Sequence, residues 1–114
     1  MSYKFKEIWC NKGNFTESNR KSSEIDTLVI HYTGNNGDTA ENNGNYFKNN
    51  VVETSAHYFV DDTTVVRSVA DKNIAWHAGD WDINCRSIGI EIAGSTTECT
   101  GKTLENVILL AQRL

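Results

Sequence analysis

The feature that most constrains the fold of this chain is a series of four short, mostly apolar blocks that each carry a polar side chain at or near the end. They are IDTLVIHYT (25–33), TSAHYFVDD (54–62), AWHAG (75–79) and RSIGIEIAG (86–94). An apolar run such as 28–30 is typical of a buried strand, and a polar group at its end faces either a cleft or a dry core, where it is costly. All three histidines lie in the first three blocks, and Glu91 lies inside the fourth. We therefore expect one shared site, and imidazoles together with a carboxylate favour metal-assisted hydrolysis.

The succession of blocks and polar stretches predicts one α/β domain with a mixed central β-sheet flanked by helices. A chain of 114 residues has room for one small domain. The first helix is expected to begin at a cap formed by Asp38 or Thr39, although Gly44 weakens its pattern. The expected elements, in order, are a strand at 26–32, that helix to about 50, strands at 55–61, 65–69 and 87–92, and a C-terminal helix capped by Thr103.

The N-terminal end of the chain is expected to lie outside this domain, and the C-terminal end is expected to stop within it. Residues 1–24 are mostly polar and are expected to form a lead-in segment that drapes over a domain comprising 25–114. The C-terminal helix carries an apolar stripe that reaches Leu114 without a glycine cap. We therefore expect the domain to lack its C-terminal part, with an exposed apolar flank that allows self-association. The stripe consists of Leu104, Val107, Ile108, Ala111 and Leu114.

Composition excludes several classes of function. Eleven Lys and Arg residues against 15 Asp and Glu residues give a net charge of −4, without a basic cluster, so we expect no nucleic-acid ligand. No apolar run approaches the ~20 residues that a membrane helix needs. The lysine-containing N-terminus lacks an apolar segment, so no signal peptide is predicted.

The cysteines are expected to be free thiols. Cys10, Cys85 and Cys99 form no metal-like pair, and an odd number without an export signal is typical of a reducing compartment. A Cys10–Cys85 or a Cys85–Cys99 bridge stays open as an alternative.

With these blocks in view, the chain resembles the type 2 N-acetylmuramoyl-L-alanine amidase family, a zinc family that includes phage amidase lysins and the peptidoglycan recognition proteins. The resemblance rests on VIHYT (29–33), SAHYFVDD (55–62), AWHAG (75–79), and Asn84 followed by SIGIEIAG (87–94). It covers roughly residues 25 to 114. It implies a mixed α/β fold, and hydrolysis of the amide between the lactyl group of N-acetylmuramic acid and L-alanine in cell-wall peptidoglycan.

The resemblance also implies roles for individual residues. His31 matches the first zinc ligand of the family, and Glu91 matches the acid that activates the metal-bound water. His57 and His77 match positions that line the substrate cleft. The second histidine, the Asp or Cys ligand and a catalytic Lys or Thr belong to a motif that this chain does not contain, so the remaining Zn²⁺ ligands are expected beyond Leu114. The 114 residues alone are therefore expected to bind zinc weakly and to have little activity.

Each of these residues also has a purely structural interpretation. His31 can be a hydrogen-bonded histidine at a strand end, and Glu91 can be an exposed acid opposite the isoleucines of its strand. His57 can be a satisfied core histidine. His77 and Trp76 are expected to contact substrate, with packing beneath a long loop as the alternative. Asn84 is expected among the substrate-binding residues and as the group that fixes the loop entering the strand.

Three functions remain open from the sequence. The first is a zinc amidase of phage, prophage or bacterial origin, either cytoplasmic or released by host lysis to act on the cell wall. The second is a non-catalytic peptidoglycan-binding module on the same fold. The third is an unrelated hydrolase that uses His31 and Glu91 without zinc.

Overall fold

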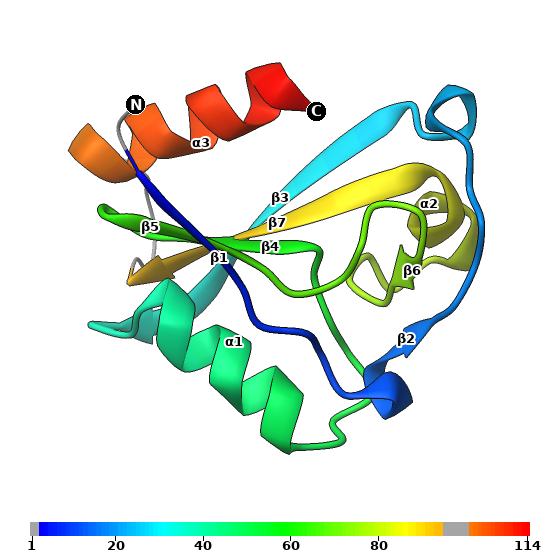
Figure 1. Ribbon diagram of the computed structural model, residues 1–114, viewed down its shortest axis with the longest axis horizontal. Coiled ribbons are helices and arrows are strands. Elements are labelled where there is room, and N and C mark those ends of the chain that lie inside the picture. Colours follow the sequence, from blue (N-terminus) through cyan, green and yellow to red (C-terminus); the bar gives the residue numbers. More distant parts are fainter. Residues whose placement is uncertain (1–2, 95–100) are drawn as a thin grey trace.

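The computed structural model describes residues 3–94 and 101–114, and its centre is a five-stranded mixed β-sheet. Helices α1 and α3 cover opposite faces of this sheet, which gives three layers (Figure 1). The predicted fold class is thereby confirmed. In sheet order the strands are β1 (Lys4–Glu7), β5 (Thr64–Arg67), β4 (Tyr58–Val60), β7 (Ser87–Gly94) and β3 (Thr27–Asn36).

Strand β7 is the centre of the fold because it pairs in parallel with both β3 and β4. Successive side chains of a strand point to opposite faces. Ile88, Ile90 and Ile92 are at most 2% exposed and pack toward α3, in a cluster with Val107 and Leu110 of that helix. The intervening side chains of β7, Glu91 among them, therefore lie on the face that α1 covers.

Helix α1 (Ala40–Asn49) begins where the sequence predicted, because the Thr39 side chain accepts a hydrogen bond from the amide of Asn42. Gly44, which weakened the sequence pattern, has a packing role. A Cβ atom at this position would lie 2.8 Å from Val66 and 3.2 Å from Ile8. The glycine therefore allows the helix to approach the sheet closely.

Helix α3 (Gly101–Arg113) packs on the sheet through Val107 and Leu110. Thr103 lies inside the first turn of this helix, so the prediction that it is the cap is wrong. Six apolar side chains that are 41–48% exposed come from α3, from the residue after it, and from the face of edge strand β3 that is paired with the isoleucines of β7. That they form one flank through which the protein self-associates stays a prediction. They are Leu104, Ile108, Leu114, Leu28, Ile30 and Tyr32.

The N-terminal segment is part of the sheet, which corrects the prediction that residues 1–24 only drape over the domain. Strand β1 pairs in parallel with β5, and a short strand β2 (Phe15–Thr16) pairs with β6 (Ile74–Ala75). Isolated apolar residues among lysines gave no strand pattern for β1, so its pairing is a tertiary effect. Two 3-10 turns, η1 (Lys12–Asn14) and η2 (Ser22–Glu24), complete the segment.

The AWHAG loop leads into a short helix that the sequence pattern did not reveal. Helix α2 (Trp81–Arg86) is capped by Asp80, whose side chain accepts from the amide of Ile83. Six residues are too few to display an apolar period, which explains the omission. Together with β2 and β6, this helix lies at one end of the sheet (Figure 1).

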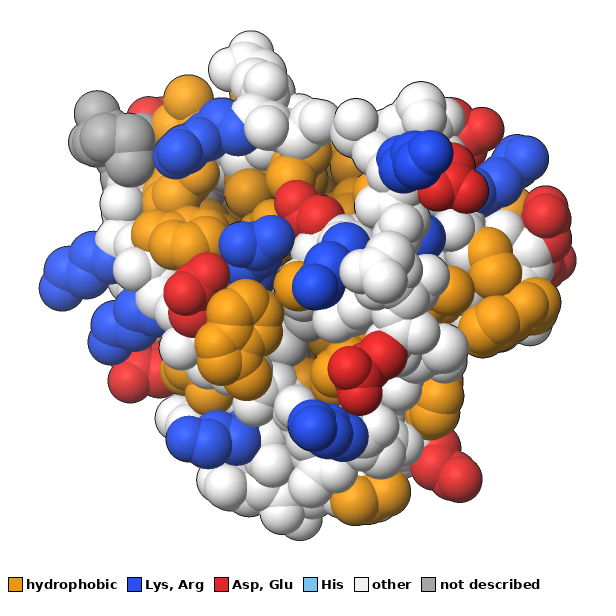
Figure 2. Space-filling model, turned by 45° about the vertical axis from the view of Figure 1, so that its right-hand side comes forward, with side chains coloured by type: hydrophobic (Ala, Val, Ile, Leu, Met, Phe, Trp, Pro, Cys, Tyr) orange, Lys and Arg blue, Asp and Glu red, His pale blue; other side chains and the backbone are white. Residues whose placement is uncertain are grey.

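Charged side chains of both signs lie on the surface of the described residues. Basic and acidic side chains are interspersed with apolar ones on the face shown in Figure 2. In the described part of the chain, no helix is long and apolar enough to cross a membrane. Cys10 and Cys85 are not bonded to each other, whereas Cys99 lies outside the described residues.

Asn14 gives a test of how firmly the N-terminal segment belongs to the domain. Its buried amide donates to the carbonyls of Phe47 and Asn50, and its oxygen accepts from the amides of Val52 and Glu53. Asn14→Ala leaves these groups without partners, so the free energy of unfolding should fall by about 2–4 kcal/mol in urea denaturation. The exposed Asn45→Ala should change it by less than about 0.5 kcal/mol. Equal effects of the two variants would refute this role of Asn14.

Candidate active site around His31 and Glu91

His31 and Glu91 lie side by side on the sheet. They are register partners in the parallel pair of β3 and β7, and Phe59 of β4 is the partner of Glu91 on the other side. Residues paired in this way point to the same face of a sheet. His31 and Glu91 therefore lie on one face of the sheet, the face covered by α1, whose Phe47 stacks on Phe59. That the two residues belong to one shared site stays a prediction.

The His31 ring is half-buried and contacts His77 from the AWHAG loop. Nε2 of His31 lies 3.1 Å from Nδ1 of His77, with the two rings edge to face at a centroid distance of 5.3 Å. Nε2 of His77 in turn lies 2.9 Å from Oγ of Ser87, the first residue of β7. Burial lowers the pKa of His31, and it lowers the pKa of His77 to about 4, helped by the nearby His57, His31 and Arg20.

The position of His77 is set by its loop and by the strand beneath it. Asn84 is buried, and its Oδ1 accepts from the amides of His77 at 3.3 Å and Ala78 at 2.9 Å. The imidazole lies against Gly89, where a Cβ atom would come within 2.7 Å of the His77 ring. Asn84 therefore fixes the loop, as the sequence indicated, and its side chain is committed to the protein.

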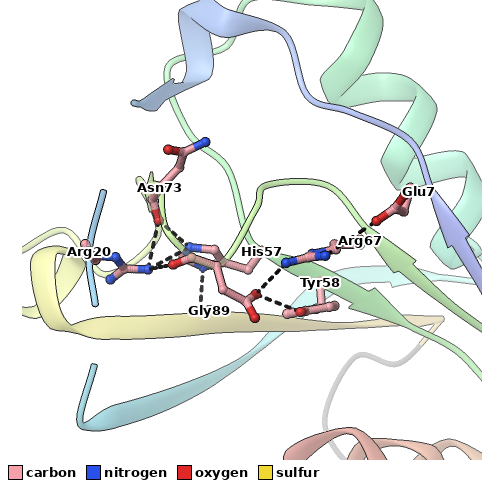
Figure 3. Close-up of polar contacts among 8 residues, drawn as sticks. Glu7, Arg20, His57, Tyr58, Arg67, Asn73 and Gly89 are labelled. Carbon is pink, nitrogen blue, oxygen red and sulfur yellow. Dashed lines mark hydrogen bonds and ion pairs between the residues drawn. The ribbon is translucent and has the colours of Figure 1, made fainter. Parts of the chain in front are cut away.

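His57 has a different environment from the other two histidines. It is 0% exposed, its Nδ1 accepts from the amide of Gly89 at 3.1 Å, and its Nε2 lies 2.8 Å from the carbonyl oxygen of Asn73 (Figure 3). Burial lowers its pKa to about 4. Both ring nitrogens are used within the fold, so the prediction that His57 lines the cleft and contacts substrate is corrected: it is a core histidine.

Beside His57 lies a half-buried arginine, Arg20, that sequence reasoning missed. The Arg20 guanidinium donates to backbone carbonyl oxygens at 2.6–3.3 Å, and the carbonyl of Asn73 accepts from both Arg20 and His57 (Figure 3). One arginine in a polar loop gives no sequence signal for such a role. The acceptor residues are Asp71, Asn73, Asn84, Cys85 and Ser87.

Glu91 is the titratable group best suited to proton transfer at neutral pH. Burial raises its pKa from 4.5 to about 7, and the negative charge of Asp38 adds to this. Its Oε1 is buried and has no hydrogen-bond donor among the residues that the structure describes. A carboxyl group with a pKa near 7 can both accept and release a proton in the physiological range.

Glu91 opens into a groove of about 530 Å³ between α1 and the end of β3. None of the three histidines lines this groove, so His77 is near the site without forming its wall. The lining combines aromatic rings with amides and hydroxyls, as ligand pockets commonly do. Its residues are Tyr32, Thr33, Asn35, Asp38, Asn42, Asn43, Tyr46, Phe47, Thr54, Phe59 and Glu91.

Trp76 serves the fold through its polar atoms. Its indole nitrogen donates to Oγ1 of Thr16 at 2.8 Å, its amide donates to Oγ of Ser55, and its carbonyl accepts from the amide of Ser55. The bond to Thr16 ties the N-terminal segment to the AWHAG loop, and the bonds to Ser55 tie the loop to the segment before β4. The ring is only partly buried, and its predicted contact with substrate stays a prediction.

The described residues fit a zinc ion only in part. His31 has one ring nitrogen, Nδ1, that makes no hydrogen bond within the described part of the chain, and neutral imidazole is a good zinc ligand. However, residues 3–94 and 101–114 contain no group of three His, Cys, Asp or Glu side chains that could hold a metal ion. His31 is therefore suited to be one ligand.

The sequence of this chain is similar to those of known proteins. The sequence model of N-acetylmuramoyl-L-alanine amidase matches residues 21–114. Two similar proteins of Bacillus subtilis (strain 168) carry that name. CwlA is 41% identical over 71 residues, which are 60% of this chain and 26% of CwlA. XlyB is 31% identical over 98 residues, which are 83% of this chain and 31% of XlyB.

The solved structure of the catalytic domain of XlyA superposes with a TM-score of 0.82 at 27% identity, over 96% of this chain and 74% of that one. The chain thus spans most of a solved catalytic domain but less than a third of the length of CwlA or XlyB. On the match over residues 21–114, this chain belongs to the N-acetylmuramoyl-L-alanine amidase family.

Proposed function

We propose that this protein hydrolyses the amide between the lactyl group of N-acetylmuramic acid and L-alanine in peptidoglycan. The observation that carries the proposal is the placement of His31 and Glu91 at paired positions of two parallel strands, with Glu91 in the groove. Membership of the amidase family supports it, as do the names of CwlA and XlyB.

In this proposal Glu91 moves the proton. Its carboxylate accepts a proton from the attacking water as the oxygen bonds to the amide carbon. The same carboxyl group then gives the proton to the nitrogen as the C–N bond breaks, so that a carboxylic acid and a free amine leave. A pKa of about 7 suits both steps, because the group is neither a weak acceptor nor a weak donor near neutral pH.

The groove beside Glu91 is the proposed binding place for the substrate. Asn42 and Tyr46 of α1 present an amide and a half-exposed ring, which suit the polar and apolar parts of a muropeptide. Trp76 and His77, both partly exposed, remain proposed contacts at the other side of His31. Asn84 contributes by holding the AWHAG loop in place.

Zinc is the proposed cofactor, since the family is generally zinc-dependent. His31 is proposed as one of its ligands. When bound, zinc polarises the scissile carbonyl and lowers the pKa of a coordinated water to roughly 7. The cell wall is the proposed place of action, reached after release from the producing cell.

One observation favours a second candidate, a peptidoglycan-binding module without catalysis. The described residues supply no group of three side chains suited to a metal ion, and a zinc site in a protein normally takes at least three. Binding of muropeptides without cleavage in the presence of added zinc would support this candidate over the amidase.

The catalytic role of Glu91 is tested by Glu91→Gln, which keeps the shape of the side chain but cannot accept the proton. Cleavage of purified muropeptides, followed by liquid chromatography, should slow by about 10²–10⁴-fold with zinc content unchanged. Glu105→Gln on the exposed side of α3 is the matched control and should leave the rate unchanged. A Glu91→Gln protein that cleaves at the normal rate would contradict the assignment.

The metal-binding role of His31 is tested by His31→Ala. Because an imidazole nitrogen contributes a full ligand bond, the variant should lose zinc at chelator concentrations that the unchanged protein withstands. Tyr32→Phe, at the next position of β3, should retain zinc. If the protein with His31 intact cleaves muropeptides after complete removal of metal, zinc is not the cofactor.

The raised pKa of Glu91 also has a consequence for stability that needs no substrate. Above pH 4.5 the unfolded chain releases this proton, whereas the folded protein keeps it until about pH 7. The folded state therefore binds more protons, and this group lowers the free energy of unfolding as pH rises from 4.5 to 7. Relative to the unchanged protein, Glu91→Gln should be more stable by on the order of 1–3 kcal/mol at pH 8. In urea denaturation the difference should vanish near pH 4, and a difference that does not vary with pH would contradict this account.

A further inference from the structure

Ser87, His77 and His31 form an unbroken series of polar contacts that ends at the proposed metal ligand. Oγ of Ser87 lies 2.9 Å from Nε2 of His77, and Nδ1 of His77 lies 3.1 Å from Nε2 of His31. Each hydrogen bond needs one donor and one acceptor. The direction of either bond therefore determines which ring nitrogen of each histidine carries the proton.

Only two arrangements of protons satisfy both contacts when the rings are neutral, because a neutral imidazole has one N–H and one bare nitrogen. In the first, His31 donates from Nε2 to His77, which donates from its own Nε2 to Ser87. In the second, Ser87 donates to His77, which donates from Nδ1 to His31. The first leaves Nδ1 of His31 bare, and the second leaves it protonated.

The choice between these arrangements rests on the proposed function, in which His31 binds zinc. A metal ion binds only a bare ring nitrogen, and Nε2 of His31 is occupied by the contact with His77. Ligand histidines commonly donate their other ring N–H to a neighbouring acceptor, which fixes the ring. We propose that His77 is a positioning residue that accepts the Nε2 proton of His31 and so presents Nδ1 of His31 to the metal.

The surroundings of His77 favour such a role because they leave the ring little freedom. A Cβ atom at Gly89 would come within 2.7 Å of the ring, so the imidazole rests directly on the β7 backbone. The loop amide of His77 is held by Asn84. Ser87 is 0% exposed, and its carbonyl accepts from Arg20 at 2.9 Å, which anchors the far end of the series.

His57 provides an internal reference for a histidine ring whose protonated nitrogen is fixed by its contacts. Its Nδ1 accepts from a backbone amide and its Nε2 faces a backbone carbonyl, so the ring must carry its proton on Nε2. It lies near His77, at a ring-centroid distance of 6.2 Å, but neither of its nitrogens contacts another histidine. The protein contains only three histidines, so all of them can be assigned in one spectrum.

The experiment is long-range ¹H–¹⁵N NMR of the imidazoles in the zinc-free protein at about pH 8, above the ordinary histidine pKa of about 6.5. All three histidines should carry the proton on Nε2, with His57 giving the reference pattern. Protonation of His31 on Nδ1 would overturn the proposal. This readout requires neither metal nor catalysis, so it stands or fails apart from the proposed function.

Two substitutions of His77 distinguish the effect of its hydrogen-bond acceptor from the effect of its ring shape. His77→Asn places an amide oxygen near the position of Nδ1, whereas His77→Phe keeps the ring shape without any acceptor. The Phe variant should give His31 a mixture of protonation on both nitrogens, and the Asn variant should keep Nε2 protonated. An unchanged His31 pattern in the Phe variant would overturn the proposal. The His57 pattern reports whether either variant is folded, and Ser87→Ala offers a second test without altering the His77 side chain.

Zinc titration then separates the positioning role of His77 from the metal-ligand role of His31. His77→Phe should weaken zinc binding about 10–100-fold, and His77→Asn should restore most of the loss. If zinc binds through Nε2 of His31, the positioning role fails while the amidase proposal survives. If His31 shows the expected protonation but does not bind zinc in any form of the protein, the proposed metal-ligand role fails instead.

Discussion

The parallel pairing of β3 with β7 is the interaction on which the rest of the structure depends. It places His31 beside Glu91 and, one residue away, Ile30 beside Ile90. Alternation along β7 sends the isoleucines into the α3 layer and Glu91 toward the groove. A slip of one residue along β7 would reverse its two faces, so that Glu91 would point into the apolar α3 layer and the isoleucines toward the groove. The cost of that error and the burial of the isoleucines specify the same register, so the core and the site are secured together.

Beneath the site, Arg20 joins segments that are far apart in the sequence. Its donors reach carbonyl groups in the loop before β6 and at the start of β7, and His57 shares one of these acceptors. A half-buried guanidinium that donates to several carbonyl oxygens is strongly oriented, because each lost hydrogen bond would leave a charged donor without its partner. The N-terminal segment is thereby part of the framework beneath the proposed site, both through Arg20 and through β1.

The three histidines illustrate how surroundings give one residue type three different roles. His57 has both nitrogens bound within the fold and no exposed surface. His77 uses both nitrogens to connect Ser87 with His31, and His31 keeps one nitrogen uncommitted. Glu91 adds a carboxyl group whose burial opposes ionisation. A carboxyl group in such a poorly solvated position lowers stability once it ionises, and groups of this kind are common in active sites.

The sequence by itself determined the fold class and the principal strands, because apolar runs with polar ends record burial directly, and it singled out His31 and Glu91, which the structure places at paired positions. It also located α1 through Thr39, since a helix cap is a local interaction. Only the tertiary structure decided that residues 4–7 form a strand, that Arg20 binds several backbone carbonyl groups, and that His57 belongs to the core while His77 contacts His31. These outcomes depend on partners 16 to 67 residues away, from His57 and Asn73 to Arg20 and Ser87. Local patterns carry no information about such distant partners, and chain folding alone brings them together.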